Sequence, residues 1–277
     1  MPLLDRIGVD IGGKLAVEDA VEAARQKSIK FIDIQLDIGE NRIDLFDDQR
    51  IGRLRDRIVE ADLGVGLHTL SAVNVAEFSP FLSEAVDRYM MAYVDMAAKL
   101  HARHVVVHAG FHFTADRARR MQAGRDRLSK ITEYAERRGV LLLLENMNKE
   151  PDDAEVHYLA HSVEEWRFYF EQIRSGSLGL AFTANHAHIM PDGVDGFIDA
   201  IPMDRVGEVR LADCWRNGKE EHLMVGEGDF DFAAMFNRLE GGGFKGPYVA
   251  AFVSLEAMVA ARSQLVAMAA GAGVDVS

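Results

Sequence analysis

Four apolar, strand-like segments of the sequence end on or beside a side chain that can bind a metal or transfer a proton. The segments read GVGLHTL, HVVVHAG, LLLLENMN and GLAFTANH, and they carry His68, His108, Glu145 and His186. Enzymes built on parallel barrels and doubly wound sheets perform their chemistry at the carboxyl ends of the strands. The repeated placement therefore favours an enzyme, with Glu145, His186 and His108 as the candidate catalytic groups.

The elements that must position these residues alternate between short β-type runs and amphipathic helical stretches. We expect strands at residues 7–11, 31–36, 65–70, 104–108, 140–145, 178–183, 206–211 and 248–253. We expect helices near residues 17–27, 49–61, 82–100, 115–137, 163–173, 194–200, 232–239 and 255–270. Because eight strand–helix units follow one another without a linker, the pattern predicts an α/β fold, a (β/α)8 TIM barrel in a single domain over residues 1–277.

The alternation of side chains along a barrel strand predicts which residues face the interior. If Glu145 points inward, Leu143 and Leu141 do so as well, and Glu208 shares a face with Arg210. Charged groups at interior positions cost several kcal/mol unless they are paired or functional. These residues therefore predict a polar cavity at the barrel mouth that is open to solvent.

Composition narrows the classes of partner and cofactor. The 277 residues are 48% hydrophobic and carry a formal net charge of −13, which would repel a nucleic acid. The single cysteine, Cys214, excludes an internal disulfide framework and favours a reducing, cytoplasmic location. No apolar run is long enough to span a membrane, and the first strand–helix turn, DIGGKLA, lacks the G-x-G-x-x-G pattern. We therefore expect a small-molecule substrate, no membrane or nucleic-acid partner and no nucleotide cofactor.

Taken in this order, the segments resemble the xylose isomerase-like TIM barrel superfamily, which includes sugar and polyol isomerases and epimerases and endonuclease IV. The resemblance runs from about residue 7 to residue 252 and rests on LHTLSAVNVA, VVVHAG, LLENMN, RLAD and EEHLMVGEGDFDF. It implies an isomerase or epimerase that moves a proton next to a carbonyl group of a sugar, polyol or keto acid. It also implies a homodimer, the common assembly in the resembling family.

The resemblance departs from the family pattern at the usual metal site. Isomerases of the family hold one divalent cation with Glu, Asp, His and Glu on strands five to eight, and the matching positions here are Glu145, Thr183, Arg210 and Ala251. A guanidinium about 4 Å from a divalent ion would cost about 8 kcal/mol at an effective dielectric constant of 20. We therefore expect no ion at that position, where Arg210 supplies a fixed positive charge instead.

Endonuclease IV has further metal ligands, and the resemblance carries them over to two trios of residues: His68, His108 and Glu145, and His186, Glu220 and His222. Two histidines and one carboxylate suit zinc, iron or manganese. The candidate metal ligands are therefore Glu145, His68, His108 and His222. A site without metal, in which these histidines line the substrate pocket, stays open as the alternative.

The expected substrate-binding residues are Arg210, Arg216, His68 and Glu208. Arg216 matches a family arginine that binds substrate oxygens, although its segment, WRNGKEE, also fits a solvated loop. Because Ala251 replaces the second carboxylate of the family's epimerases, dehydratase or lyase chemistry is an alternative to isomerisation. A ligand-binding barrel without catalysis and a phosphodiesterase resembling endonuclease IV are further alternatives, the latter opposed by the acidic net charge.

Overall fold

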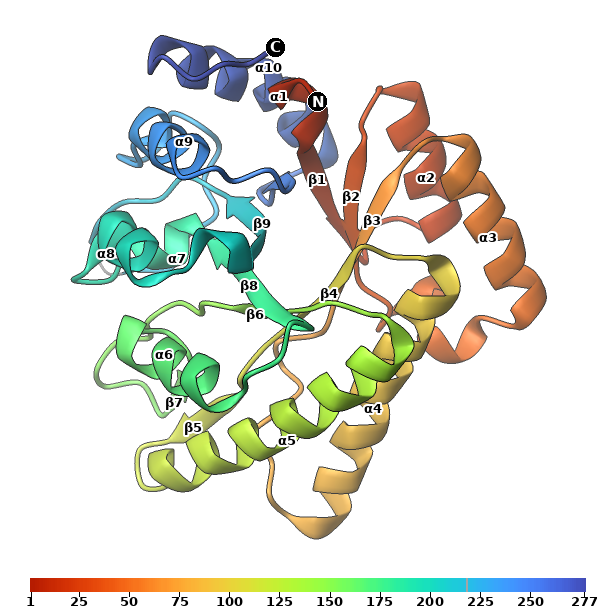
Figure 1. The fold of residues 1–277 in the computed structure, drawn as a ribbon, viewed down its shortest axis with the longest axis vertical. Helices are drawn as coiled ribbons and strands as arrows, with labels where there is room; N and C mark the ends of the chain where they lie inside the picture. Colours follow the sequence, from red (N-terminus) through yellow and green to blue (C-terminus); the bar gives the residue numbers. More distant parts are fainter. Residues whose placement is uncertain (218) are drawn as a thin grey trace.

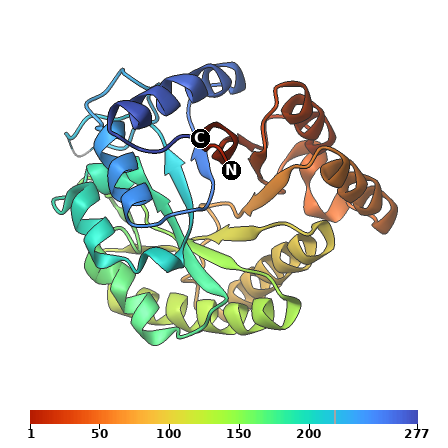
Figure 2. The same cartoon turned by 45° about the horizontal axis from the view of Figure 1, so that its top comes forward.

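The computed structural model describes residues 1–217 and 219–277, and eight of its strands close into a barrel (Figures 1 and 2). Around the barrel the order is β1-β10-β9-β8-β6-β4-β3-β2, and neighbouring strands run parallel. The strands are β1 (Ile7–Gly12), β2 (Phe31–Ile34), β3 (Gly64–His68), β4 (His104–Val107), β6 (Leu142–Glu145), β8 (Leu178–Thr183), β9 (Val206–Leu211) and β10 (Tyr248–Ala250). The prediction of a (β/α)8 TIM barrel is confirmed.

Helices surround the barrel and cover the outer faces of its strands (Figure 2). The helices of the described residues are α1 (Leu3–Arg6), α2 (Val17–Gln26), α3 (Asp48–Glu60), α4 (Pro80–Leu100), α5 (Arg117–Arg138), α6 (Val163–Gln172), α7 (Ala184–His188), α8 (Gly193–Ala200), α9 (Phe232–Gly241) and α10 (Leu255–Gly271), with 3-10 turns at Gly39–Asn41, Ile43–Leu45 and Met203–Arg205. Side chains cap four of the helices at their first turn: Asp47, Ser162, Asp231 and Ser254. Among the described residues, none of these helices is both long and apolar enough to cross a lipid bilayer.

The inside of the barrel holds a small apolar cluster that is separate from the larger core between strands and helices. Val106, Leu143 and Ala181 pack together there, with Leu141 beside them. Each of the first three precedes a polar residue of the barrel mouth by two positions, so that the polar residue shares its face. The predicted inward orientation of Glu145 with Leu143 and Leu141 is thus confirmed, and the cluster forms the apolar layer next to the polar mouth.

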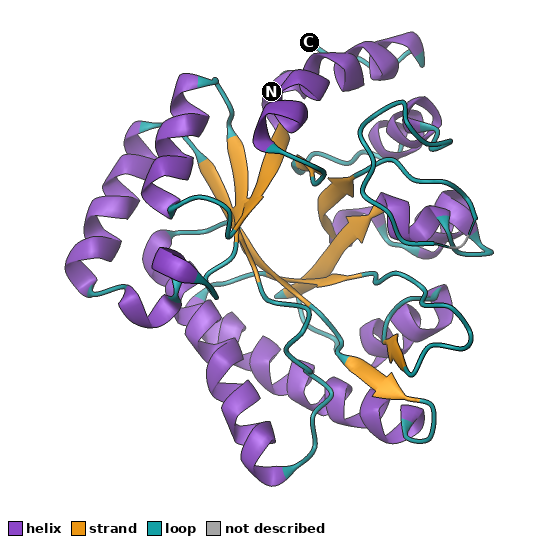
Figure 3. Ribbon diagram, turned by 180° about the vertical axis from the view of Figure 1, so that it is seen from behind, coloured by secondary structure: helices purple, strands orange, loops and turns teal. Residues whose placement is uncertain are grey.

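Several elements near the mouth differ from the expected pattern. β5 (Phe111–Phe113) and β7 (Val156–Tyr158) form an antiparallel pair outside the barrel (Figure 3), joining the loops that follow β4 and β6. The short helix α7 begins directly after β8, in a segment that is not among the expected helices. The last strand ends at Ala250, three residues before its predicted end. Such short elements are fixed by contacts with distant segments, which hydrophobic periodicity does not record.

Candidate active site

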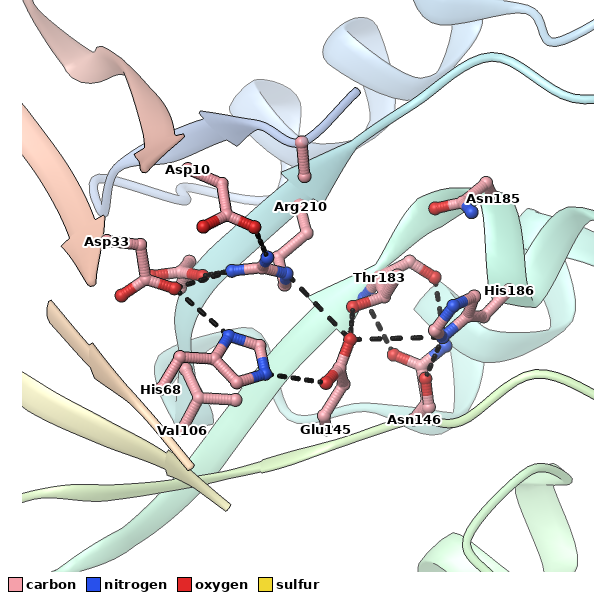
Figure 4. Close-up of polar contacts among 12 residues, drawn as sticks. Asp10, Asp33, His68, Val106, Glu145, Asn146, Thr183, Asn185, His186 and Arg210 are labelled. Carbon is pink, nitrogen blue, oxygen red and sulfur yellow. Dashed lines mark hydrogen bonds and ion pairs between the residues drawn. The ribbon is translucent and has the colours of Figure 1, made fainter. Parts of the chain in front are cut away.

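A cavity of about 330 Å³ opens at the carboxyl ends of the barrel strands and contains all four strand-end groups that the sequence singles out. Its lining comprises Gln35, His68, Ser71, His108, Glu145, Met147, Asn148, Glu150, Tyr158, His186, Arg210, Glu220 and His222. The structure thus brings six of the predicted site residues to one place. Figure 4 shows how several of these side chains converge from different strands.

Three donor atoms converge on one side of the cavity, from residues at the ends of β3, β4 and β6. His68 Nε2 lies 3.2 Å from His108 Nε2 and 3.4 Å from Glu145 Oε2, and His108 Nε2 lies 3.0 Å from Glu145 Oε2. All three side chains are buried. We call His68, His108 and Glu145 the histidine–glutamate trio.

The other ring nitrogen of each histidine in the trio is fixed by a partner that accepts its proton. His68 Nδ1 donates to Asp33 Oδ2 over 3.1 Å. His108 Nδ1 donates over 3.2 Å to the hydroxyl oxygen of Thr69, which itself donates to the carbonyl of Val106. Both Nε2 atoms therefore face Glu145, an orientation common in metal-binding histidines.

Three converging lone pairs repel one another unless a positive charge lies among them. Burial and the charge of Arg210 act to lower the pKa of His68, but its hydrogen bonds to Asp33 and Glu145 prevail and raise that pKa to about 10. Burial lowers the pKa of His108. Despite burial, the contacts with the imidazoles of His108 and His68 hold the pKa of Glu145 well below its ordinary value. The trio thus favours a positive charge at its centre, which a proton on His68 supplies.

The spacing of the trio also fits a metal ion. Four ligands placed tetrahedrally around zinc at about 2.0–2.2 Å lie about 3.3–3.6 Å from one another, and the trio's separations of 3.0 to 3.4 Å are close to this range. Two imidazoles and one carboxylate are a ligand set for zinc, iron or manganese, and they leave coordination positions open toward the cavity.

The position at which the resembling isomerases hold their ion does not fit a metal in this chain. Thr183 Oγ1 donates to Glu145 Oε1 over 2.5 Å, and Arg210 Nε lies 3.8 Å from the same oxygen. Ala251 supplies no ligand; its backbone carbonyl instead accepts a hydrogen bond from His222. The guanidinium of Arg210 therefore occupies this side of the site with its own positive charge.

Arg210 is held by three carboxylates from the first, second and seventh strands of the barrel. Its Nη1 donates to Asp33 over 2.6 Å and to Glu208 over 3.0 Å, and its Nη2 donates to Asp10 over 2.7 Å. Burial opposes the charge, but these carboxylates keep the pKa of Arg210 well above its ordinary value. Together with Glu145, four carboxylates surround one guanidinium, which leaves the floor of the cavity with a surplus of negative charge.

A second group of donors, His186, Glu220 and His222, lies across the cavity, with its ligand atoms within 4.8 Å of one another. His186 Nδ1 donates to the carbonyl of Asn146 over 2.8 Å, so its Nε2 carries the lone pair and lies 3.8 Å from Glu220 Oε1. His222 Nε2 lies 2.6 Å from the same oxygen. Burial acts to lower the pKa of His222, but the hydrogen bond to Glu220 prevails and raises it. His222 is thus a proton donor beside His186, a proton acceptor.

Two of the predicted substrate-binding residues do not line the cavity. Glu208 has no exposed surface and accepts hydrogen bonds from Arg210 and His104 deep inside the barrel. Arg216 is exposed outside the cavity, and its guanidinium donates to the carbonyl of Pro191. Cys214 is buried, and burial raises the pKa of its thiol to about 12, which leaves it unreactive near neutral pH.

Sequence reasoning missed the two carboxylates that hold Arg210 from the first strands, Asp10 and Asp33. A signal was present, because each is a lone acidic residue inside an apolar strand, and such a residue requires a partner. His104, which is not among the candidate residues from the sequence, donates to Glu208 over 2.7 Å. Asp10 and Asp33 thus hold Arg210 directly, and His104 holds it through Glu208.

The comparisons with known proteins agree with this architecture. A family model described as "Xylose isomerase-like TIM barrel" matches residues 21–263. No curated protein matches the chain.

Solved structures share the fold at low sequence identity. A D-tagatose 3-epimerase-like protein is 20% identical with a TM-score of 0.83, covering 99% of this chain and 98% of its own. D-psicose 3-epimerase from Clostridium cellulolyticum H10, solved with D-tagatose, is 15% identical with a TM-score of 0.77, covering 99% and 98%. A xylose isomerase domain protein from Alicyclobacillus acidocaldarius subsp. acidocaldarius is 14% identical with a TM-score of 0.75, covering 96% and 99%.

Proposed function

The chain belongs to the xylose isomerase-like TIM barrel family, and from that premise we propose that it is an isomerase or epimerase that moves a proton next to the carbonyl group of a sugar or polyol. One observation carries the proposal: the histidine–glutamate trio and a separately oriented imidazole, His186, face the same small cavity. The cavity of about 330 Å³ has the size of a small-molecule site. Structural neighbours named as sugar 3-epimerases share the fold and make this substrate class the natural one to test.

In this proposal His68, His108 and Glu145 bind a divalent zinc, manganese or iron ion, which would polarise a substrate carbonyl as a Lewis acid. The donor spacing and the fixed Nδ1 atoms support this assignment. The surplus of negative charge around Arg210 supports it further, because a cation on the trio would offset that charge.

His186 acts as the general base in the same scheme. Its Nδ1 is committed to the carbonyl of Asn146, which leaves the Nε2 lone pair free to accept a proton from a substrate carbon. Arg210 places a fixed positive charge beside the negative charge that develops on the substrate oxygen. His222, paired with Glu220, then returns a proton to the substrate.

Dehydration or lyase chemistry is a second candidate, and one observation favours it over two-base epimerisation. The strand-eight position of the second carboxylate is Ala251, whose carbonyl accepts a hydrogen bond from His222. Abstraction by His186 of a proton from the carbon next to the carbonyl is common to epimerisation and dehydration. The products separate the reactions, because dehydration releases water and a carbon–carbon lyase splits the substrate into two fragments.

The test is deuterium incorporation from heavy water into a panel of ketoses and polyol-derived ketones, with Zn²⁺, Mn²⁺ or Fe²⁺ supplied. We expect deuterium at the carbon next to the carbonyl together with an isomer or epimer, detected by NMR. His186→Gln should lower the rate by about 10²–10⁴-fold. The matched control is His188→Gln, because His188 is paired with Asp229 outside the cavity. Unlabelled substrates and no product under any of these metals would refute the proposal.

A further inference from the structure

Asp33 is a buried carboxylate of β2 that contacts two groups of the site without lining the cavity. Its Oδ2 accepts a hydrogen bond from His68 Nδ1 over 3.1 Å and another from Arg210 Nη1 over 2.6 Å. The side chain has no exposed surface. Asp33 can therefore influence a bound substrate or metal only through the two residues that it holds.

The local packing directs this carboxylate toward the site. Asp33 lies opposite Gly66 of β3 in the barrel register, and a Cβ atom at Gly66 would lie 2.4 Å from Asp33 Oδ1. The absence of a side chain at Gly66 thus leaves the space that the carboxylate fills. Among the described residues Oδ1 has no hydrogen-bond partner, so the hydrogen bonds of this carboxylate all fall on Oδ2, which faces His68 and Arg210.

The consequence for His68 is geometric. An imidazole can aim its Nε2 lone pair at a fixed point only if its ring is held and its proton stays on Nδ1. The carboxylate of Asp33 does both, because it cannot donate a hydrogen bond to Nδ1 and it is itself held by Arg210. The contact also ties the ring of one trio member to the guanidinium that occupies the other side of the site.

We propose that Asp33 is a positioning residue that sets the metal affinity of the histidine–glutamate trio by holding the ring of His68. The inference rests on the proposed function in one respect, that the trio binds a divalent metal. Carboxylate partners of metal-binding histidines typically change metal affinity by about 10- to 100-fold. An effect of that size is expected here without any contact between Asp33 and the metal.

The test is the affinity for Zn²⁺, measured by competition with a chelator in wild type, Asp33→Asn and Asp10→Asn. Both variants remove one carboxylate charge from Arg210, but only Asp33 contacts His68. We expect Asp33→Asn to weaken binding by about 10- to 100-fold and Asp10→Asn to weaken it much less. Equal losses in the two variants would overturn the proposal, because they would show that only the charge matters.

A second measurement separates positioning from general structural support. In a His68→Gln background the ring that Asp33 holds is gone, so Asp33→Asn should cause little further loss of Zn²⁺ affinity. Losses that simply add would contradict the inference. If Asp33→Asn does not fold, Gly66→Ala displaces the same carboxylate and takes its place in the cycle. The assay measures Zn²⁺ affinity and does not require turnover. A protein that is inactive on every sugar could therefore still confirm the role of Asp33, and an active protein could still refute it.

Discussion

Thr183 Oγ1 donates a hydrogen bond of 2.5 Å to Glu145 Oε1, the carboxylate oxygen that the two histidines of the trio do not share. The two oxygens of Glu145 thus have separate tasks. Oε2 faces His68 and His108, while Oε1 is satisfied by a hydroxyl at the end of β8 and lies near Arg210. The strand-six position of the family's metal ligand has become a hydrogen-bond donor to the carboxylate itself.

Removing that hydroxyl should destabilise the protein. Thr183→Val keeps the shape of the side chain but leaves Glu145 Oε1 without its hydrogen bond, at a cost of about 1–3 kcal/mol in the free energy of unfolding. The matched control is Thr132→Val, because the hydroxyl of Thr132 is buried without a partner among the described residues. Denaturant unfolding should show Thr132→Val to be neutral or stabilising, and equal losses in both variants would contradict the assignment.

Arg210 should be far more important to stability than arginines on the surface. Arg210→Met leaves Asp10, Asp33 and Glu208 without their shared partner in the barrel interior, and we expect a loss of about 3–5 kcal/mol. Arg238→Met breaks ion pairs that are half exposed and should cost about 0–1 kcal/mol. Chemical denaturation of the two variants measures both values. A loss below about 1 kcal/mol at position 210 would show that the carboxylates find other partners.

The metal-free protein should lose stability as the solution becomes alkaline. The folded state raises the pKa of His68 from 6.5 to about 10, so its stabilising contribution is complete below pH 6.5 and disappears as the pH rises to about 10. The contribution is on the order of a few kcal/mol. Unfolding measured in the presence of a chelator should therefore show a decline across this window that is absent in His68→Gln. Parallel pH curves for the two proteins would exclude the effect.

Metal content should depend on Glu145 and not on histidines outside the cavity. Glu145→Gln removes the carboxylate of the trio, so the variant purified without chelator should hold much less metal than the wild type purified in the same way. His112→Gln is the control, because His112 lies on β5 away from the cavity. Elemental analysis measures the metal content of the wild type, Glu145→Gln and His112→Gln. Stoichiometric metal in Glu145→Gln would place the ion elsewhere, and metal in none of them would leave Arg210 as the central charge.

The barrel and half of the site could be predicted because their signals are local. Four of the apolar strand segments end on or beside a functional group, and side-chain alternation then places His108 and Glu145 on the inward face with Val106 and Leu143. His68 follows from the same argument. The position of each strand and the alternation of its side chains are enough to place these residues at the same end of the barrel.

The parts of the site and of the fold that the sequence does not predict depend on contacts between distant segments. Asp33 reaches Arg210 across the barrel interior, and their sequence separation of 177 residues gives no sign of the pairing. Arg216 lies in a loop whose direction is set by Asp229 and by the carbonyl of Pro191, so family position alone could not place its guanidinium. The β5–β7 pair likewise forms between two loops that no periodic pattern connects.

The interior carboxylates and their shared guanidinium also constrain how this barrel can diverge. Asp10, Asp33 and Glu208 all bind Arg210, so loss of the guanidinium would leave each of them with fewer partners, and loss of the three carboxylates would leave Arg210 without these partners. Natural variants should therefore exchange these four positions as a group, with a neutral residue at position 210 accompanied by the loss of acidic partners. A substitution at only one of these positions would leave an unpaired charge in the barrel interior.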